Sequence, residues 1–493
     1  MSMRKICWLL AIMALMGLGI ATSWAQQDNT PTGQVESTTA SPTSPSGPSQ
    51  TPVNAPNPSQ GQPPAPAPMP PLSGVQVLAP TFGATSEDYF VPALACTEHA
   101  STDPTGLNRN SGLFSETSCA GKVTLQRVDK RTQLNLDLTG GSYFYDRPIN
   151  AGTTQNFKRY GTAEELSVFE QVNGRRWNWM VGDQGTYLPE GALGYSEFAG
   201  LSSFAGGMGG GSMASAPALN GAFSPNQSIY GGMARRFSDL ATSEFNYLVG
   251  PRTALTATAM FGTQQFLTPG YIDDRYWVIM TGYNRTFGRS NEFALSYDEM
   301  HFNFGASQQG MLTRGASILY GRQVSPKLSV QVSVAPMARE ISVPQAGSAT
   351  SFFLGTADSV KYRALRWDGS LKFDRTLSGG SGYLAGAERT MLMATLGRQL
   401  SRRVHGSVDM AYANNRSVAQ TSAGVPRPSY DYVLGGVNLT HELGRHVSMY
   451  VNYSVQRQTA NTPLCEGTTC STVYFRQIGG VGINWHAQPI KIH

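Results

Sequence analysis

A short turn recurs through the second half of this chain. In each copy an apolar residue is followed by Gly or Ser and, within the next two or three positions, by Arg or Lys. The copies begin at residues 249, 287, 324, 400 and 443, and each separates two segments in which apolar and polar residues alternate. Successive copies lie about 38, 37, 76 and 43 residues apart, and the long step spans two periods. This period fits one hairpin of two membrane-length strands plus a long loop at the far end.

The length of the alternating segments points to strands that cross a membrane. Leu134, Leu136 and Leu138 alternate with polar residues, which places the leucines on one face of a strand. A soluble β-sandwich would show the same alternation, but its strands average about 5–6 residues. The alternating runs of this chain reach about 10–14 residues, which is long enough for a tilted membrane strand.

We therefore predict an all-β fold: a closed antiparallel transmembrane β-barrel of about 16 strands, with short turns in the periplasm and long loops outside. The number of strands should be even, so about 14 and about 18 are the alternatives, and one more hairpin around residues 228–236 would lead to eighteen. Closure requires the first predicted strand to pair with the last. The strands are expected near residues 132–145, 160–172, 175–188, 237–249, 252–264, 275–287, 291–304, 312–323, 327–339, 352–365, 367–378, 390–400, 403–415, 430–443, 446–459 and 471–486.

Three segments carry a resemblance to a known class of proteins. They are residues 247–252, 397–403 and 482–486. The chain from about residue 132 to residue 485 resembles the porin-like outer-membrane β-barrels of Gram-negative bacteria, and the three segments are similar to those of an uncharacterised exported family from environmental bacteria. The resemblance implies a channel or surface protein in the cell outer membrane, with outer-membrane lipid, lipopolysaccharide and the barrel-assembly machinery as partners. Such barrels often end in an aromatic residue, whereas Trp485 is the last aromatic residue here.

The remaining segments divide the chain further. Residues 1–25 have the basic start, apolar centre and small-residue cleavage site of a secretory signal peptide. Residues 26–72 are rich in Pro, Ser and Thr and are expected to be a disordered linker, which could reach peptidoglycan or a periplasmic protein. Residues 73–130 show no clear period and are expected to form a small periplasmic or plug segment. The barrel should span 131–487 and be followed by a C-terminal tail, 488–493. No run after the signal peptide is apolar enough for a membrane helix.

Four cysteines remain after the signal peptide, and they form two local pairs. Cys465 and Cys470 are separated by four residues in a Gly/Thr segment, and Cys96 precedes Cys119 in the segment before the barrel. An oxidising periplasm allows both pairs to form disulfides. Zinc is the alternative for four cysteines, but neither pair has the spacing of a zinc site.

The alternation also predicts which side chains face outward and which face the lumen. Aromatic residues near strand ends are expected in girdles at the membrane interfaces. These residues are Trp177, Trp179, Tyr276, Trp277, Tyr430, Tyr432 and Trp485. The charged residues expected to line the pore are Lys361, Arg363, Lys372, Asp374, Asp298, Arg398 and Asp409. Their mixed signs fit a water-filled pore of weak selectivity or, alternatively, ion pairs in a plugged barrel.

These features predict a passive channel for small hydrophilic solutes. The alternative is a surface adhesion or envelope-anchoring protein, in which the loops and the linker act while the lumen stays blocked. An enzyme is less favoured, because the sequence holds no nucleophile elbow, zinc-protease motif or paired-acid geometry. We propose no catalytic, metal or cofactor residues. The net charge of +5 is spread thinly and predicts no nucleic-acid partner.

Overall fold

The computed structural model describes most of the region predicted to form the barrel. The described residues are 88–102, 113–146, 149–150, 156–157, 159–188, 234–268, 270–288, 290–305, 309–343, 347–380, 382, 384–418, 427–462 and 472–492. The predicted signal peptide, the linker 26–72 and the Cys465–Cys470 pair lie outside them. Within the described residues, no helix has the length and hydropathy to span a membrane.

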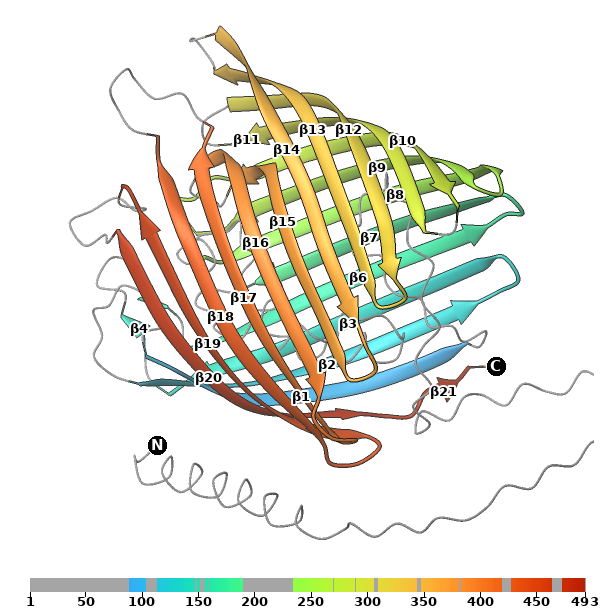
Figure 1. Ribbon diagram of the computed structural model, residues 1–493. Coiled ribbons are helices and arrows are strands. Elements are labelled where there is room, and N and C mark those ends of the chain that lie inside the picture. Colours follow the sequence, from blue (N-terminus) through green and yellow to red (C-terminus); the bar gives the residue numbers. More distant parts are fainter. Residues whose placement is uncertain are drawn as a thin grey trace, which may run out of the picture. The chain divides into compact units, whose positions relative to one another are not determined.

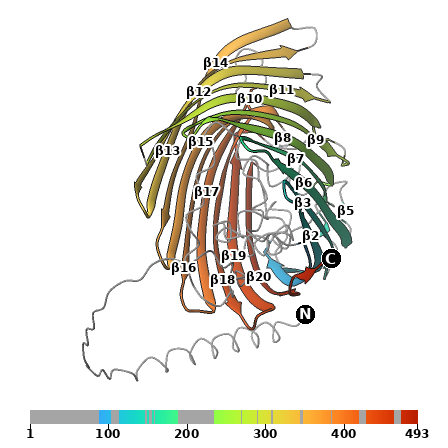
Figure 2. The same cartoon turned by 90° about the vertical axis from the view of Figure 1, so that its right-hand side faces the viewer.

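One antiparallel sheet closes on itself as a barrel of eighteen long strands, joined by a short nineteenth strand, β21 (Figures 1 and 2). Two further short strands, β4 (Ile149–Asn150) and β5 (Asn156–Phe157), pair with each other outside this sheet. The strands of the main sheet are β1 (Tyr89–Ser101), β2 (Phe114–Val128), β3 (Thr132–Tyr145), β6 (Tyr160–Asn173), β7 (Trp177–Leu188), β8 (Arg236–Gly250), β9 (Thr253–Phe266), β10 (Asp274–Phe287), β11 (Asn291–Phe304), β12 (Gln309–Ser325), β13 (Leu328–Val343), β14 (Gly347–Arg363), β15 (Trp367–Gly380), β16 (Ala385–Gln399), β17 (Val404–Ser417), β18 (Ser429–Glu442), β19 (Val447–Ala460), β20 (Val473–His486) and β21 (Ile490–Lys491).

All sixteen predicted strands are present, and each recurring turn joins two of them. The copy missing from the long step is the turn between β14 and β15, where the Ala364 backbone N–H donates to the Trp367 carbonyl at 2.7 Å. The spacing of the recurring turns predicts a turn at this place, midway along the 76-residue step. The turn sequence there lacks Gly and Ser, so the motif search passes over it.

The prediction for residues 73–130 is wrong where the structure describes them. β1 and β2 are strands of the barrel wall and not a plug or a periplasmic segment, and they raise the strand number from sixteen to eighteen. Small and polar residues occupy both faces of β1, so its outward and inward positions differ little in polarity and no alternation stands out. The alternative count of eighteen is therefore the correct one, reached through these strands. β8 begins at Arg236, and residues 189–233 lie outside the described part of the chain.

Closure of the barrel also differs from the prediction. β20 pairs with β1, β1 with β2 and β2 with β3, so the strand at 132–145 does not meet the strand at 473–486. Part of the predicted C-terminal tail, 488–493, belongs to the sheet, because Ile490 and Lys491 of β21 pair with Phe90 and Tyr89 of β1. The last residues of the barrel are thereby attached to its first strand.

The two closing strands β1 and β2 carry the predicted Cys96–Cys119 disulfide. The two cysteines are direct cross-strand neighbours and are bonded. Replacing both with Ser should destabilise the barrel by roughly 3 kcal/mol, the loop-closure value for a separation of this size. We expect the folded band on unheated SDS gels to convert to the unfolded band at a lower temperature. An unchanged conversion temperature would show that the ladder alone holds the closing strands.

Candidate functional site

The barrel wall has an apolar outer face. Side chains that alternate with the lumen-facing ones are large, apolar and exposed around most of the circumference. In a soluble protein such a continuous surface would aggregate, whereas it matches the lipid-facing band of a transmembrane barrel. The barrel is therefore porin-like in architecture and belongs in the outer membrane. Examples on different strands are Leu94, Leu138, Leu166, Val181, Phe261, Ile279, Leu295, Ile318, Val332, Leu354, Leu371, Leu392, Val408, Val437 and Ile483.

An aromatic girdle lies at the end of the barrel that carries the short turns. Trp177, Trp179 and Trp485 are exposed on the outer face, as predicted. The same end also exposes Tyr247, Tyr283, Phe287, Tyr320, Tyr362 and Trp367. Tyr276, Tyr430 and Tyr432 are not part of a girdle, since each lies on the inner face and the last two are fully buried. The position of an aromatic residue near a strand end therefore did not predict which face of the sheet it occupies.

Six of the seven predicted pore-lining residues occupy inward positions of their strands. Asp298, Lys361 and Asp409 are in step with buried inward residues such as Ala294, Phe353 and Ala413. The ladder between β14 and β15 then places Arg363 opposite Asp368, and Lys372 and Asp374 on the same face. A strip of charges of both signs therefore runs along the inside of β14 and β15.

Arg398 faces the opposite way, and the prediction for it is wrong. It lies directly across from Trp367, and its guanidinium carbon is 4.5 Å from the centroid of that ring. Trp367 is exposed on the outer face, as is Leu396, two positions from Arg398. The sequence of β16 hides this, because the consecutive apolar residues 391–393 leave its alternation without a clear phase.

The inward charges differ in their access to solvent. Lys361, Arg363 and Lys372 are exposed although they point inward, so the lumen is open to water near the short-turn end of β14 and β15. Asp298 is 4% exposed and Asp409 0% exposed. The short-turn end of the strip thus carries exposed basic side chains, whereas the buried acids Asp298 and Asp409 lie on β11 and β17.

The sequence search missed several other charged groups on the inner wall. Lys122 of β2 and Asp137 of β3 form an ion pair at 3.4 Å, and Arg389 of β16 donates to Asp374 of β15 at 2.7 Å. Arg476 of β20 donates to Gln456 of β19 at 2.6 Å and is fully buried. Their alternation with outward apolar residues was available in the sequence. Lys122 was missed because β2 was not recognised as a strand.

The wall is interrupted between β14 and β15 at the end opposite the short turns. The β14–β15 ladder runs from Arg363–Asp368 only as far as Thr356–Arg375. β14 continues to Gly347 paired with β13, and β15 continues to Gly380 paired with β16. Residues 347–355 of β14 therefore have no partner on β15, and Figure 2 shows the end of β14 standing away from it. Phe352, in this stretch, is 88% exposed.

The free end of β15 and the start of β16 lie inside the barrel, and we call their described residues, 377–380, 382 and 384–387, the inner hairpin. They contact β10 and β11, which are not their neighbours in the sheet. The Ile272 backbone N–H donates to the Gly382 carbonyl at 2.7 Å, and Leu377 is buried in a cluster with Phe302, Met337 and Phe353. The hairpin therefore packs against the inner side of β10–β14 and narrows the lumen at the end opposite the short turns.

Glycines allow the inner hairpin to approach the wall. A Cβ added at Gly379 would lie 2.4 Å from Oδ2 of Asp274, and one at Gly382 would lie 2.2 Å from Phe266. Gly382 and Gly386 also have φ values of +75° and +78°, which side chains disfavour. Close packing of this hairpin thus depends on glycine at three positions.

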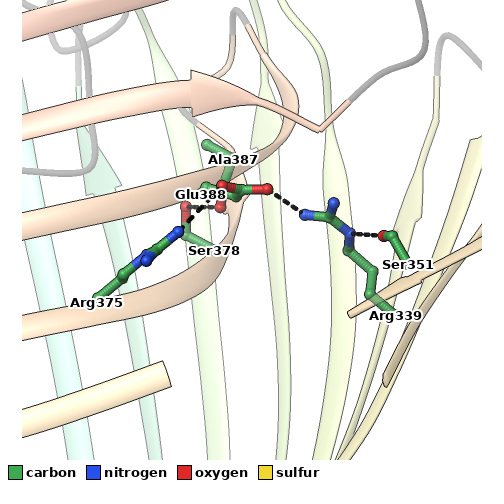
Figure 3. Close-up of polar contacts among 6 residues, drawn as sticks. All are labelled: Arg339, Ser351, Arg375, Ser378, Ala387 and Glu388. Carbon is green, nitrogen blue, oxygen red and sulfur yellow. Dashed lines mark hydrogen bonds and ion pairs between the residues drawn. The ribbon is translucent and has the colours of Figure 1, made fainter. Parts of the chain in front are cut away.

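A salt bridge links the start of β16 to the inner face of β13 (Figure 3). Arg339 donates from Nη1 to Oε1 of Glu388 at 2.8 Å and from Nε to Ser351 at 3.1 Å. Arg375 approaches the other oxygen of Glu388 at 3.9 Å. The Arg339 side chain is 5% exposed and that of Glu388 is 21% exposed. Because β14 and β15 lie between β13 and β16 in the sheet, this contact exists only while the hairpin is inside.

Comparison with known proteins adds little to this description. No protein-family model matches the sequence, and no curated protein is similar to it. Among solved structures, the chain is similar to Acinetobacter baumannii OccAB4, with 7% identity and a TM-score of 0.43 over 83% of this chain and 99% of that chain. It is also similar to the outer membrane protein OpdK of Pseudomonas aeruginosa, with 10% identity and a TM-score of 0.39 over 81% and 98% of the two chains. Likeness at this level carries no weight for function, which has to come from this chain's own residues.

Proposed function

We propose that the protein is a passive channel for small hydrophilic solutes across the outer membrane. The observation that carries this proposal is the basic group Lys361, Arg363 and Lys372, which faces inward and is nevertheless exposed to solvent. Charged side chains remain hydrated only where water reaches them, since burying an unpaired charge is costly. Barrels of about 16–18 strands are wide enough to hold such an aqueous path.

The inner hairpin sets the width of this path at the end opposite the short turns. It lies across the inside of β10–β14, and Glu388 holds it there through Arg339. Solutes that pass the basic group must pass this narrow end as well. We therefore assign charge selection to the short-turn end of the lumen and size selection to the end that holds the hairpin.

Planar-bilayer recordings of the purified full-length protein test the proposal. We expect stable single-channel steps in simple salt solutions, with a weak preference for anions because Lys361, Arg363 and Lys372 are basic. Barrel that is shown to be folded by its heat-dependent mobility on gels, and that still produces no steps, would contradict the channel. That result would favour the adhesion or anchoring alternative, in which the lumen is blocked.

A further inference from the structure

The backbone geometry of the recurring turn does not explain why each copy contains an Arg or Lys. Tight turns require residues such as Gly, Asn, Asp or Pro, and a basic side chain contributes nothing to their backbone geometry. Among the described short turns, Asp129 is the one acidic residue. Their basic residues are Lys130, Arg131, Arg175, Arg176, Arg252, Lys327, Arg366, Arg402, Arg403 and Arg445. This end of the barrel therefore presents a ring of positive charge.

One cavity of about 300 Å³ lies on this ring, between the β8–β9 and β10–β11 turns. Arg252, Thr253, Arg285 and Phe287 are among its lining residues. Arg285 lies across from Thr253 in the ladder, and its guanidinium carbon is 5.1 Å from the centroid of the Phe287 ring. The Thr286 N–H donates to the Arg252 carbonyl at 2.9 Å, which holds the two turns together. Two arginines and a threonine thus line one opening.

Thr253, Arg285 and Phe287 give the cavity a side that faces outward, toward lipid. Arg285 occupies an outward position of β10, in step with the exposed Ile279 and Tyr283. Tyr283 and Tyr247 flank Leu255 on the outer face, in the row of side chains next to the cavity. Interfacial tyrosines mark the depth of the headgroups, so the cavity lies at headgroup level. In the described part of the chain, no carboxylate lies within ion-pair distance of Arg252 or Arg285.

We infer that this cavity binds the phosphate of an anionic glycerophospholipid in the leaflet at the short-turn end. The guanidinium groups of Arg252 and Arg285 match the oxygens of a phosphate in charge and hydrogen-bond geometry, and Thr253 adds a hydroxyl donor. Phe287 and the neighbouring tyrosines provide apolar contact for the glycerol and the first acyl carbons. The proposal concerns the outer face of the barrel, so it does not depend on whether the lumen conducts.

Native mass spectrometry of the full chain in detergent, with added phosphatidylglycerol, tests the site. The variant is Arg252→Gln/Arg285→Gln. The matched control is Arg314→Gln/Arg416→Gln, which removes two outward arginines from the opposite end. We expect phosphatidylglycerol adducts on the unmodified protein and on the control, and a roughly tenfold weaker affinity for the test variant. Mobility on unheated gels confirms that each variant is folded.

Four results would overturn the inference. Equal adducts on all three proteins would show that the cavity is not the site. Equal loss in both variants would show that only net charge matters. Binding of phosphatidylcholine as tight as that of phosphatidylglycerol would exclude recognition of an anionic lipid. Preference for lipid A phosphate would assign the cavity to the other leaflet.

Discussion

Removing the carboxylate of Glu388 should raise the conductance of the channel several-fold. In Glu388→Gln the Arg339 guanidinium, which is almost fully buried, loses its charged partner. Removal of one partner of a buried ion pair costs about 3–5 kcal/mol, and the partial exposure of Glu388 puts the cost here toward the low end. Among the described residues, the inner hairpin is then held by its apolar contacts and by the Ile272–Gly382 and Val418–Gly386 hydrogen bonds. We expect it to leave the lumen for part of the time, with larger single-channel steps.

An unpaired strand edge on β14 is available to the inner hairpin when it leaves the lumen. Residues 347–355 of β14 present an unpaired strand edge, and an outward hairpin can extend the β14–β15 ladder along that edge. The new backbone hydrogen bonds along β14 would compensate for the packing that the hairpin gives up inside the barrel. The matched control is Glu340→Gln, because Glu340 is next to Arg339 on β13 but exposed on the outer face. Its conductance should equal that of the unmodified protein.

A cysteine pair at positions 274 and 379 should have the opposite effect. The Cβ position at Gly379 is 3.2 Å from Cγ of Asp274, so a disulfide between Asp274→Cys and Gly379→Cys is within reach. Oxidised protein should show small and constant steps, and a reducing agent should make them larger and variable. The unmodified protein with the same reducing agent controls for reduction of Cys96–Cys119. Identical steps in both redox states and in Glu388→Gln would show that the hairpin does not limit the path.

Reversing two lumen charges should change the ion preference of the channel from anions to cations. Lys361→Glu/Arg363→Glu changes the local charge by four units. At about 10 Å in water each unit contributes roughly 0.4 kcal/mol, and salt near 0.1 M screens this to about a third. The cation-to-anion permeability ratio should therefore rise roughly three- to tenfold. Reversal potentials in a salt gradient measure it directly.

Arg398→Glu is the control for this experiment. Arg398 lies near the same end of the barrel as Arg363, but it stacks on Trp367 at the outer face. Its replacement should leave the permeability ratio unchanged. If Arg398→Glu shifts the ratio and the double variant does not, the facing of β14 and β16 described above is wrong. If neither shifts it, the conducting path avoids this part of the wall.

The sequence by itself determined the architecture and the facing of most strands. In Leu134, Leu136 and Leu138, and in the similar runs of the other strands, the alternation of polarity follows directly from the two-sided environment of lipid and water. Turn chemistry located the hairpins because short turns admit few residue types. The Cys96–Cys119 pair could be proposed from oxidising export alone. Strands β1 and β2 were not detected because small and polar residues occupy both of their faces, which leaves no contrast in polarity.

Only the tertiary structure decided how the barrel closes and where the lumen is narrowed. Pairing of β20 with β1, and of Ile490 with Phe90, joins residues about 400 apart, and no local pattern encodes such a register. The alternation along β13 and β16 places Arg339 and Glu388 on opposite faces of the sheet. The two side chains meet only because the inner hairpin leaves the wall. Arg398 faces lipid because its ladder partner is Trp367. Each of these features is a long-range contact, and its energy depends on neighbours that the chain acquires only after it has folded.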